Sequence, residues 1–577
     1  MGHPGDPLVP VRGRLTRCYA APAVRISLLR IPLLLYAFAF VVRFALALAY
    51  PDPAYPDAYY YVDVGRAIAS GHGLNVDFIW IFAEVGGHIP ANPVLPVPSN
   101  GHWLPLSSIL QAASMTVFGQ TALASALPII AIGSLIGPLV WLIAREAGCR
   151  PVVQIGAALL AGAPGAGAVF MPQPENFGIL QPVVAATIFL VARGLKGSPR
   201  SYVAAGLLVG VASLARNDGF LLGLAVAIVF FADRIRVLRS RGTLQPRIPF
   251  WAAVGCFAVY LLVLAPWWYR QLTVFGSLSP TATSGSALWI RTMAEWNSIT
   301  IQPTIARFLA WGWGPILDSR FFGLVAAIGN FSVIIGSVVL MPFMAVGAWT
   351  RRRSLDFQPW FLYVVVVFLG AAIIYPAHVP GGAFIHSAIG LSGHAFILAL
   401  EGVLAAVAWL AARRPRWNAE SAGRVFVVAV VAFVLALVPV YASGVQRTWD
   451  GTRQPRIALA HALDTLGVGP DERLFSIDAA GIKYWTGRGG IVTPDDPIES
   501  IEQVARAYHP RWLVLEKDDA ASALAPVLLG TSRPTWIGEP VFAVPSPTGG
   551  LPDLVLYPVC TEPGDDRCSG PPVLAYP

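Results

Sequence analysis

Three aspartates follow the first long apolar run of the sequence, in a stretch rich in proline and tyrosine. The run ends at Tyr50, and Asp52, Asp57 and Asp63 come next within Pro-Asp-Pro-Ala-Tyr-Pro-Asp-Ala-Tyr-Tyr-Tyr-Val-Asp. An acid in the first turn of a helix is favoured by the helix dipole, so Asp57 could simply begin a helix on a membrane surface. A carboxylate at this place could also accept a proton from a hydroxyl group. This loop contains several acids but one basic residue, Arg66, which favours the chemical interpretation.

The elements that must position these acids are membrane spans. Of the 577 residues, 55% are hydrophobic and 12% are charged, and the mean hydropathy is +0.62, whereas a soluble domain has about 25% charged residues. A span needs roughly 20 apolar residues. The sequence therefore predicts an α-helical polytopic membrane protein with about eleven transmembrane helices, near residues 27–49, 121–144, 152–170, 177–193, 201–215, 219–232, 249–268, 323–348, 359–375, 387–412 and 424–442. The net charge of +8 is spread along the chain, so nucleic acid is not an expected partner.

The apolar stretch 104–118 decides the predicted topology. It is short and contains Ser107, Ser108 and Gln111, so we interpret it as a helix on the membrane surface. More than half of the 40 Lys and Arg residues then fall on one side of the membrane, as the positive-inside rule requires. A basic N-terminal arm, residues 1–26, is predicted to be cytoplasmic. Asp57 and the C-terminal tail are predicted to face outward.

Residues 27–444 form the predicted transmembrane domain, which includes two long external loops, 50–120 and 269–322. Both loops are rich in Trp, Tyr, Pro and Gly. Loops this long in a compact domain usually carry function. No internal repeat is visible, which argues against a transporter built from two inverted halves.

The composition becomes mixed from about residue 445. Strands are predicted at 473–478, 490–493 and 512–516, a helical turn at 480–486, and a helix at 498–508. This alternation predicts a small extracytoplasmic α/β domain, residues 445–577, with a partly parallel sheet. It has no glycine-rich nucleotide fingerprint, so we expect a supporting or acceptor-binding role. Cys560 and Cys568 flank a Pro-Gly turn and are either a disulfide in an oxidising compartment or two free thiols.

Several motifs lie within or at the outer ends of the predicted spans. They are Arg43, Pro56-Asp57-Ala-Tyr-Tyr-Tyr, Ser70-Gly-His72-Gly, His102-Trp-Leu-Pro-Leu, Pro174-Glu175-Asn-Phe-Gly-Ile-Leu-Gln-Pro182, Leu214-Ala-Arg216-Asn-Asp218-Gly-Phe and Pro266-Trp-Trp-Tyr-Arg270. Together they resemble the GT-C glycosyltransferases, above all the bacterial branch related to protein O-mannosyltransferases and to the aminoarabinose transferase of lipid A. The resemblance covers roughly residues 25–450 and includes the span count.

The resemblance implies a GT-C fold and a hexosyl- or pentosyltransferase in the bacterial plasma membrane. It would move a sugar from a polyprenyl-phosphate donor to an extracytoplasmic glycan, lipid or protein, with inversion at the anomeric carbon. Asp57 would be the general base, a role that contributes about 10²–10⁴-fold. Arg270 and Arg216 would bind the donor phosphate, because a guanidinium group binds phosphate through two hydrogen bonds. An arginine that only snorkels to the interface is the alternative for Arg270.

Three further acids are candidates near Asp57. The resemblance makes Glu175 the second acid of the site, where it would orient the acceptor or help to hold a divalent ion. Asp63 and Asp218 are additional acids for the acceptor or a metal. A structural acid at a helix N-terminus is the alternative for Glu175. Its loop contains no Asp-x-Asp pattern, so no cofactor is assigned with certainty and a divalent metal stays open.

The remaining candidates are histidines and one arginine. His386 follows glycines in a short outer loop and could contact the donor phosphate or sugar, while His72 and His102 are candidates in the first loop. A lone histidine is more often structural, and that is the alternative for each of the three. Arg43 lies inside the first span, where a charge is costly, so we expect it to pair with an acid such as Asp57 or Glu175.

Two other functions remain open. A flippase or transporter of lipid-linked glycans would need charged residues at the midplane of several spans, and the sequence has few. A catalytically inactive scaffold would not need Asp57, Glu175 and Arg270 together. The pattern therefore favours the enzyme.

Overall fold

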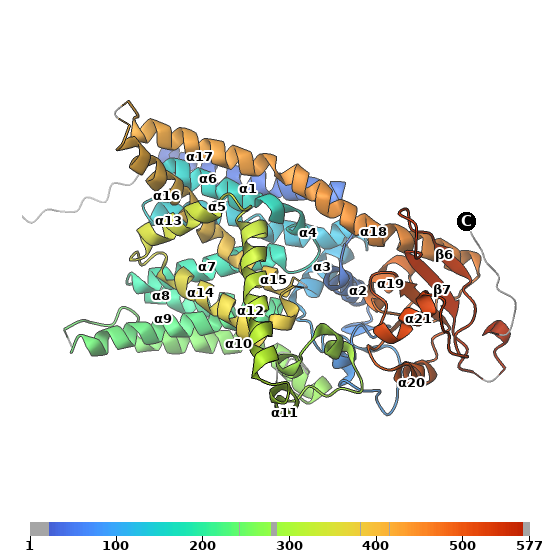
Figure 1. Cartoon of the computed structure of the whole chain (residues 1–577). Coiled ribbons are helices and arrows are strands. Elements are labelled where there is room, and N and C mark those ends of the chain that lie inside the picture. Colours follow the sequence, from blue (N-terminus) through green and yellow to red (C-terminus); the bar gives the residue numbers. More distant parts are fainter. Residues whose placement is uncertain are drawn as a thin grey trace, which may run out of the picture.

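The computed structural model describes residues 22–241, 243–278, 285–380, 382–414, 416–562 and 564–568. Figure 1 shows a helical part and a C-terminal α/β part arranged along one long axis. Residues 1–21 of the predicted N-terminal arm, which spans residues 1–26, lie outside the described residues.

The helices of the first part follow the apolar segments of the sequence. Pro151 and Pro199 open two of them at the first position, where a missing N–H costs nothing. Gly276, with a φ of 67°, ends another. The helices are α1 (Pro22–Ala49), α4 (Ala122–Gly133), α5 (Ile136–Glu146), α6 (Pro151–Gly162), α7 (Phe177–Leu195), α8 (Pro199–Ala215), α9 (Phe220–Arg239), α10 (Phe250–Phe275), α12 (Trp313–Asn330), α13 (Met341–Arg351), α14 (Gln358–Leu369), α15 (Ala383–Ala388), α16 (Ser392–Ala411), α17 (Ala419–Ala436) and α18 (Val438–Thr465).

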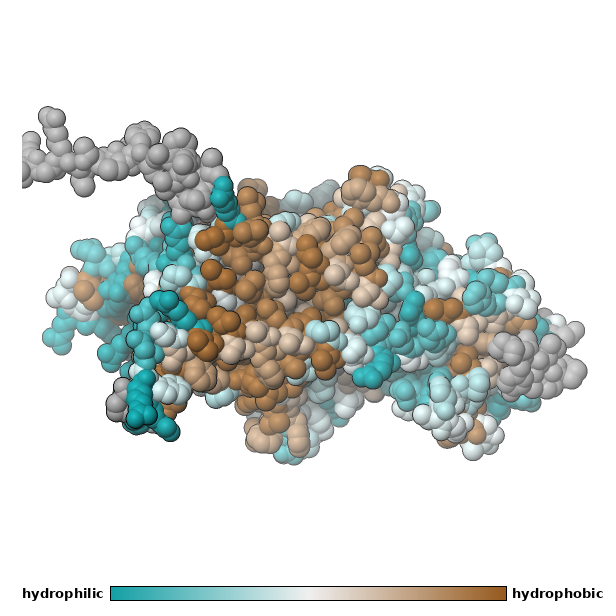
Figure 2. All heavy atoms as spheres, turned by 90° about the horizontal axis from the view of Figure 1, so that it is seen from above, coloured by the Kyte–Doolittle hydropathy of each residue, from teal (hydrophilic) through white to brown (hydrophobic). Residues whose placement is uncertain are grey.

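The protein is a multi-pass membrane protein. Among the described residues, seven helical segments are long and apolar enough to cross a membrane, judged by length and composition. Figure 2 shows a broad apolar band across one face of the helical part, with hydrophilic residues at both of its ends. Exposed residues such as Leu34 on α1, Leu262 on α10 and Val425 on α17 contribute to the apolar surface.

Two apolar stretches do not form a single straight membrane-spanning helix. Residues 104–118 form only α3 (Leu106–Phe118), which packs against α2 (Pro56–Ala69) and α4. The predicted span 323–348 is interrupted after a π-helical turn, Phe331–Ile335, because Ser337 and Val338 have positive φ angles before α13 begins. In Figure 1, α12 runs across the common direction of α10 and α17. The interruption is a backbone event that hydropathy does not reveal.

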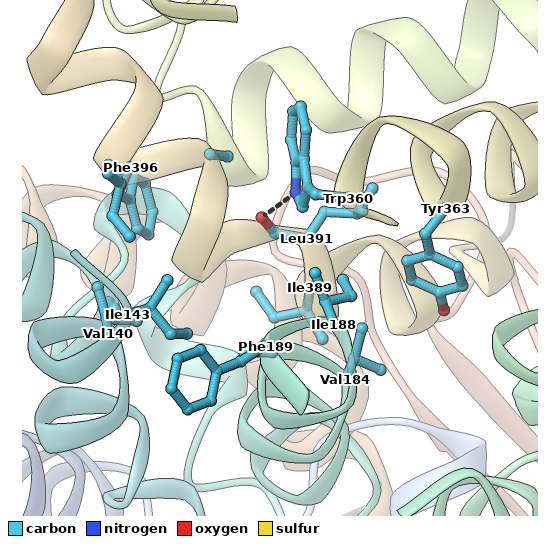
Figure 3. Packing of buried hydrophobic residues seen from close by; sticks show 14 of the residues in the cluster. Val140, Ile143, Val184, Ile188, Phe189, Trp360, Tyr363, Ile389, Leu391 and Phe396 are labelled. Atoms are coloured by element: carbon cyan, nitrogen blue, oxygen red, sulfur yellow. Dashed lines mark hydrogen bonds between the residues drawn. The ribbon is translucent and has the colours of Figure 1, made fainter. Parts of the chain in front are cut away.

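The core of the helical part lies between α5, α7, α14 and α16. Figure 3 shows branched and aromatic side chains of these helices interlocking, with the indole N–H of Trp360 donating to the carbonyl of Leu391 over 3.0 Å. Helices α13 and α16 approach more closely than side chains would permit. A Cβ atom at Gly347 would lie 1.8 Å from the carbonyl oxygen of Leu398, so this crossing requires glycine.

The C-terminal part is built on a five-stranded sheet of order β4-β3-β5-β7-β6. The three predicted strands and both helical segments are confirmed, and β3 pairs in parallel with β4 and β5. Strands β7 and β6 complete the sheet in antiparallel pairing. The elements are β3 (Leu474–Ser476), α19 (Ala479–Thr486), β4 (Gly490–Val492), α20 (Ile498–Tyr508), β5 (Trp512–Glu516), α21 (Ala525–Leu528), β6 (Phe542–Val544) and β7 (Leu554–Pro558).

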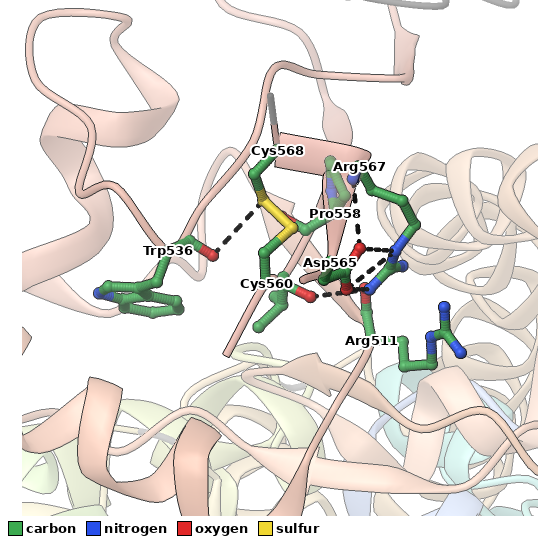
Figure 4. Close-up of a disulfide and its surroundings, with 8 residues drawn as sticks. Arg511, Trp536, Pro558, Cys560, Asp565, Arg567 and Cys568 are labelled. Carbon is green, nitrogen blue, oxygen red and sulfur yellow. Dashed lines mark hydrogen bonds and ion pairs between the residues drawn. A yellow bond between two sulfur atoms is a disulfide. The ribbon is translucent and has the colours of Figure 1, made fainter. Parts of the chain in front are cut away.

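A disulfide closes the chain after β7. Cys560 and Cys568 are joined, and the guanidinium group of Arg567 beside them donates to the carbonyls of Val559 and Arg511 (Figure 4). Arg567 also forms an ion pair with Asp565 at 2.5 Å. The cross-link therefore sits in a polar network that attaches the end of the described chain to the sheet.

The first external loop lies between the two parts. It contains α2, β1 (Asn75–Val76), η1 (Phe82–Val85), β2 (Val97–Pro98) and α3. Ile79 extends the sheet edge by a parallel bridge to Ile491 of β4. Helix α18 continues from α17 into the C-terminal part (Figure 1), so the domain boundary expected at residue 445 lies inside a helix.

Candidate active site

Two carboxylates and one imidazole converge beside the first external loop. The Nε2 atom of His386 lies 3.0 Å from Oε2 of Glu175 and 4.0 Å from Oδ2 of Asp57. One ligand atom from each of the three residues lies within 4.8 Å of the others. Residues separated by more than 300 positions in the sequence therefore share one site, the acidic cluster of Asp57, Glu175 and His386.

Local structure fixes each member of the acidic cluster. Pro56 occupies the start of α2 and places Asp57 in the first turn. Glu175 follows a tight turn before α7, and its carbonyl accepts the hydroxyl of Ser107 over 3.0 Å. The ring of Phe177 stacks on the imidazole of His386, with centroids 4.1 Å apart and an interplanar angle of 11°.

The two acids of the cluster have different protonation behaviour. Burial raises the pKa of Asp57 above its ordinary value, although His386 opposes the shift. Burial would also raise the pKa of Glu175, but His386 and Arg216 outweigh it and hold this pKa below its usual value. Glu175 is fully buried, whereas the side chain of Asp57 is 22% exposed. Carboxyl groups whose pKa values are pushed apart can take different roles in acid–base chemistry.

A cavity of about 100 Å³ adjoins the acidic cluster. Tyr61, one turn after Asp57, and Ser387, next to His386, both line it. One part of its wall is apolar and is formed by α9, α14 and α15. The polar and aromatic part is formed by Tyr61, His102, Trp103, Arg216, Asn217, Asp218, Trp296, Tyr375, His378 and Ser387.

Arg216 supplies a buried positive charge to this cavity. Its Nε atom lies 3.0 Å from Oδ1 of Asp218, and Asp218 also accepts the hydroxyl of Ser387. Burial lowers the pKa of Arg216, but Asp218, Tyr61 and the cluster acids raise it above its ordinary value, so the group stays charged. A charged guanidinium group is suited to bind an anion such as phosphate.

Two histidines of the cavity wall are neutral. Burial lowers the pKa of His102 to about 3 and that of His378 to about 4. Nδ1 of His102 and Nε2 of His378 are buried without a hydrogen-bond partner in the described structure. Such atoms normally bind a ligand or water, so both are available to a polar group in the cavity.

The overall architecture matches known membrane glycosyltransferases. The oligosaccharyltransferase AglB of Archaeoglobus fulgidus, in complex with an inhibitory peptide and a dolichol-phosphate, superposes with a TM-score of 0.52 at 14% identity, over 92% of this chain and 74% of AglB. ArnT of Cupriavidus metallidurans, bound to undecaprenyl phosphate, superposes with a TM-score of 0.50 at 15% identity, over 93% of this chain and 98% of ArnT. The chain has the GT-C fold. This confirms the predicted fold class.

Sequence comparisons add one local match. The family model for dolichyl-phosphate-mannose-protein mannosyltransferases matches residues 98–269. A comparison with curated proteins finds no match. The matched stretch contains Glu175 and Arg216 but ends before Arg270.

Several candidates lie elsewhere in the GT-C framework. Arg270 is outside the cavity wall; its Nη2 donates to the carbonyl of Ser99 over 2.7 Å, and its guanidinium group lies 4.9 Å from the ring centroid of Trp267. His72 is exposed in the turn after α2. Asp63 lies on the part of α2 near the C-terminal domain and pairs with Arg66 at 3.5 Å.

The expectation that Arg43 pairs with an acid is wrong. Its Nη2 donates to Oε1 of Gln181 over 2.5 Å, and its Nε donates to the carbonyl of Gly162. Arg43 is fully buried among α1, α6 and α7. It therefore links three helices of the GT-C domain and does not contact the acidic cluster.

Residues that the sequence did not single out complete the cavity. Tyr61 accepts the side-chain N–H of Asn176 over 2.8 Å, next to Glu175. Trp296 and His378 enter from the second external loop and from the segment before α15. The Trp-rich composition of residues 269–322 was the signal for Trp296, but nothing local marked which tryptophan turns inward.

Proposed function

We propose that this protein is a membrane glycosyltransferase that transfers a sugar from a polyprenyl-phosphate donor to an extracytoplasmic glycan, lipid or protein. The proposal rests on one observation: the acidic cluster lies beside a cavity whose wall contains the buried cation Arg216. One group can accept a proton and the other can bind a phosphate, which are the two requirements of this transfer.

Asp57 acts as the general base in this proposal. The acceptor hydroxyl loses its proton to Asp57 while its oxygen forms a bond to the anomeric carbon. The bond between that carbon and the phosphate oxygen breaks, and the polyprenyl phosphate leaves with the electron pair. Attack opposite to the leaving group inverts the anomeric configuration. The raised pKa of Asp57 supports this role because a stronger base accepts the proton more readily near neutral pH.

Arg216 binds the departing phosphate, where negative charge develops during the transfer. The cavity supports a lipid-linked donor because Leu221, Val367 and Ala371 give it an apolar wall next to the guanidinium group. Polyprenyl phosphates in AglB and ArnT, which share the fold, point to the same class of donor. Arg270, bonded to the carbonyl of Ser99, is assigned to holding the first external loop.

The acidic cluster also fits a divalent metal ion. Two carboxylates and an imidazole form a donor set that binds such ions, and Oε1 of Glu175 is buried without a partner. Asp57, Glu175 and His386 would then be the ligands. The ion would supply positive charge to stabilise the departing phosphate.

The outward orientation of the site has two supports. The cross-link between Cys560 and Cys568 is typical of an oxidising compartment, which supports an extracytoplasmic C-terminal domain. The arginine-rich ends of α9, α13 and α16 lie at the opposite end of the molecule (Figure 1), as the positive-inside rule requires for a bacterial plasma membrane.

Sugar transfer in membranes tests the proposal. Membranes containing the wild type, Asp57→Asn or Asp77→Asn would be incubated with a panel of radiolabelled polyprenyl-phosphate sugars. Asp77 is a matched control because it lies in the same loop and pairs with Lys483 at 2.6 Å. We expect Asp57→Asn to lose at least about 10²-fold in transfer and Asp77→Asn to keep it. Near-normal transfer by Asp57→Asn would remove Asp57 from the mechanism.

A further inference from the structure

One segment of the second external loop connects the cavity to the C-terminal domain. Trp296, in η5 (Met293–Asn297), places its ring between two histidines of the cavity wall. Its centroid lies 4.8 Å from that of His102 and 5.1 Å from that of His378, and both contacts are edge-on. The indole therefore determines the separation of the two histidines and the shape of this end of the cavity.

The residues directly after Trp296 are bound by one carboxylate of the C-terminal domain. Asp496 follows β4 and is 5% exposed. It accepts the hydroxyl of Ser298 over 2.6 Å, the backbone N–H of Ile299 over 2.7 Å and the hydroxyl of Thr300. Hydrogen bonds to an ionised acceptor are about twice as strong as neutral ones.

A second contact fixes the same junction. The side-chain N–H of Asn297 donates to the carbonyl of Thr493 over 2.9 Å, just before Asp496 in the sequence. On the other side of Trp296, the bonds of Glu295 among the described residues stay within its own loop, to Arg307 at 2.8 Å and to the backbone N–H of Arg291. The C-terminal domain therefore supports the segment that carries the indole, and the backbone N–H of Phe82 in the first external loop adds a longer bond of 3.5 Å to the side chain of Asn297.

We propose that Asp496 is a positioning residue for the cavity: it binds residues 298–300 and thereby keeps Trp296 between His102 and His378. The α/β domain then controls how well the cavity binds its ligand, although none of its described residues lines the wall. The identity of that ligand, a polyprenyl phosphate, rests on the proposed function. Loss of Asp496 weakens ligand binding and leaves the acidic cluster in place.

Hydrogen–deuterium exchange of the full-length protein in lipid nanodiscs tests the support itself. The variants are Asp496→Ala and the matched control Asp495→Ala, whose carboxylate accepts the backbone N–H of Ser522 within the same domain. We expect amides of residues 296–301 to exchange about tenfold faster in Asp496→Ala, with β3 and β5 still protected. Unchanged exchange in residues 296–301, or equal acceleration in the control, would overturn the proposal.

Binding of undecaprenyl phosphate to the same preparations tests the consequence. We expect Asp496→Ala and Trp296→Ala each to raise the Kd about tenfold, and the double variant to bind no more weakly than Trp296→Ala alone. The donor KM should rise in Asp496→Ala while kcat stays within about twofold of the wild type. Additive losses in the double variant would show that Asp496 does not act through Trp296, and would refute the proposal.

The two experiments separate this inference from the proposed function. A wild type that neither binds undecaprenyl phosphate nor transfers a sugar would contradict the proposed function, whereas the exchange measurement would still decide the role of Asp496. Asp496→Asn serves as a second variant, because its amide keeps one acceptor for Ser298 and Thr300 but cannot accept from Ile299 with the other atom. We expect its exchange rate to lie between those of the wild type and Asp496→Ala.

Discussion

Replacing Arg456 by methionine should strongly destabilise the C-terminal domain. Arg456 lies on α18 and is 2% exposed. Its Nε and Nη2 donate to the two carboxylate oxygens of Glu516 over 2.7 Å each, and its Nη1 donates to Asp478 over 2.6 Å. Asp478 follows β3 and Glu516 is the last residue of the neighbouring parallel strand β5, so the arginine joins the helix to the centre of the sheet.

The expected magnitude follows from the burial of all three partners. Removing one member of a buried ion pair costs about 3–5 kcal/mol, because the remaining charge is left without compensation. For a domain of this size, each kcal/mol lowers the unfolding temperature by roughly 4 °C. Arg456→Met should therefore lower the unfolding temperature of the C-terminal domain by about 10–20 °C. The guanidinium group also lies 5.7 Å from the ring centroid of Tyr59 on α2, so sugar transfer should fall as well.

Differential scanning calorimetry of the full-length protein in nanodiscs measures this effect. The matched control is Arg506→Met, an exposed arginine of the same domain that pairs with Glu502 one turn away and should matter by less than about 0.5 kcal/mol. Combining Arg456→Met with Asp478→Asn and Glu516→Gln should recover most of the loss, because no buried charge then remains unpaired. A shift no larger than that of the control, or no recovery in the triple variant, would refute the reasoning.

Three further predictions concern the pH dependence, the helix packing and the phosphate site. Burial raises the pKa of Asp63 to about 8, so the folded protein keeps a proton that the unfolded chain releases from about pH 4 upward. The free energy of unfolding should therefore fall by up to about 5 kcal/mol as the pH rises towards 8. Asp63→Asn should remove this pH dependence of the unfolding temperature, and an unchanged dependence would contradict the assignment. Gly347→Ala would force a Cβ to 1.8 Å from a backbone carbonyl of α16 and should lower the free energy of unfolding by about 3 kcal/mol or more. Gly444→Ala is the control, because a Cβ at Gly444 on α18 meets nothing within 4 Å. Equal folded yields of the two variants in size-exclusion chromatography would disprove the close approach. Arg216→Ala should reduce kcat/KM for the donor about 10²-fold, because Arg216 lines the cavity. Arg270→Ala should mainly lower the unfolding temperature, because Arg270 binds the carbonyl of Ser99. A larger kinetic effect of Arg270→Ala than of Arg216→Ala in donor titrations would reverse these roles.

The secondary structure could be predicted where the pattern is local. Strands 473–478, 490–493 and 512–516 are short apolar runs bounded by turn residues, and the structure has β3, β4 and β5 there. The span expected at 323–348 failed because its interruption depends on positive φ angles at Ser337 and Val338. Hydropathy carries no information about such a backbone turn, since both sides of it are apolar.

The candidate site was predictable one residue at a time. Asp57, Glu175, Arg216 and His386 each lie beside a span end. Motif resemblance selected the first three, whereas His386 was selected because it follows glycines in a short outer loop. The convergence of Asp57, Glu175 and His386 within 4.8 Å comes from the packing of α2, α15 and the start of α7. Arg270 lies beside a span end too, but the carbonyl of Ser99 occupies its guanidinium group. A linear motif cannot show which partner a long side chain reaches.

The sequence by itself determined that this protein is a polytopic membrane protein with an added α/β domain, because hydropathy and periodicity are properties of neighbouring residues, and the resemblance of its motifs implied the GT-C fold. Tertiary structure decided which charges meet: Asp57 with Glu175 and His386, Asp496 with the segment that carries Trp296, and Arg456 with two acids of the sheet. These contacts join residues that are distant in the sequence, and their energies depend on burial that exists only after the chain has folded.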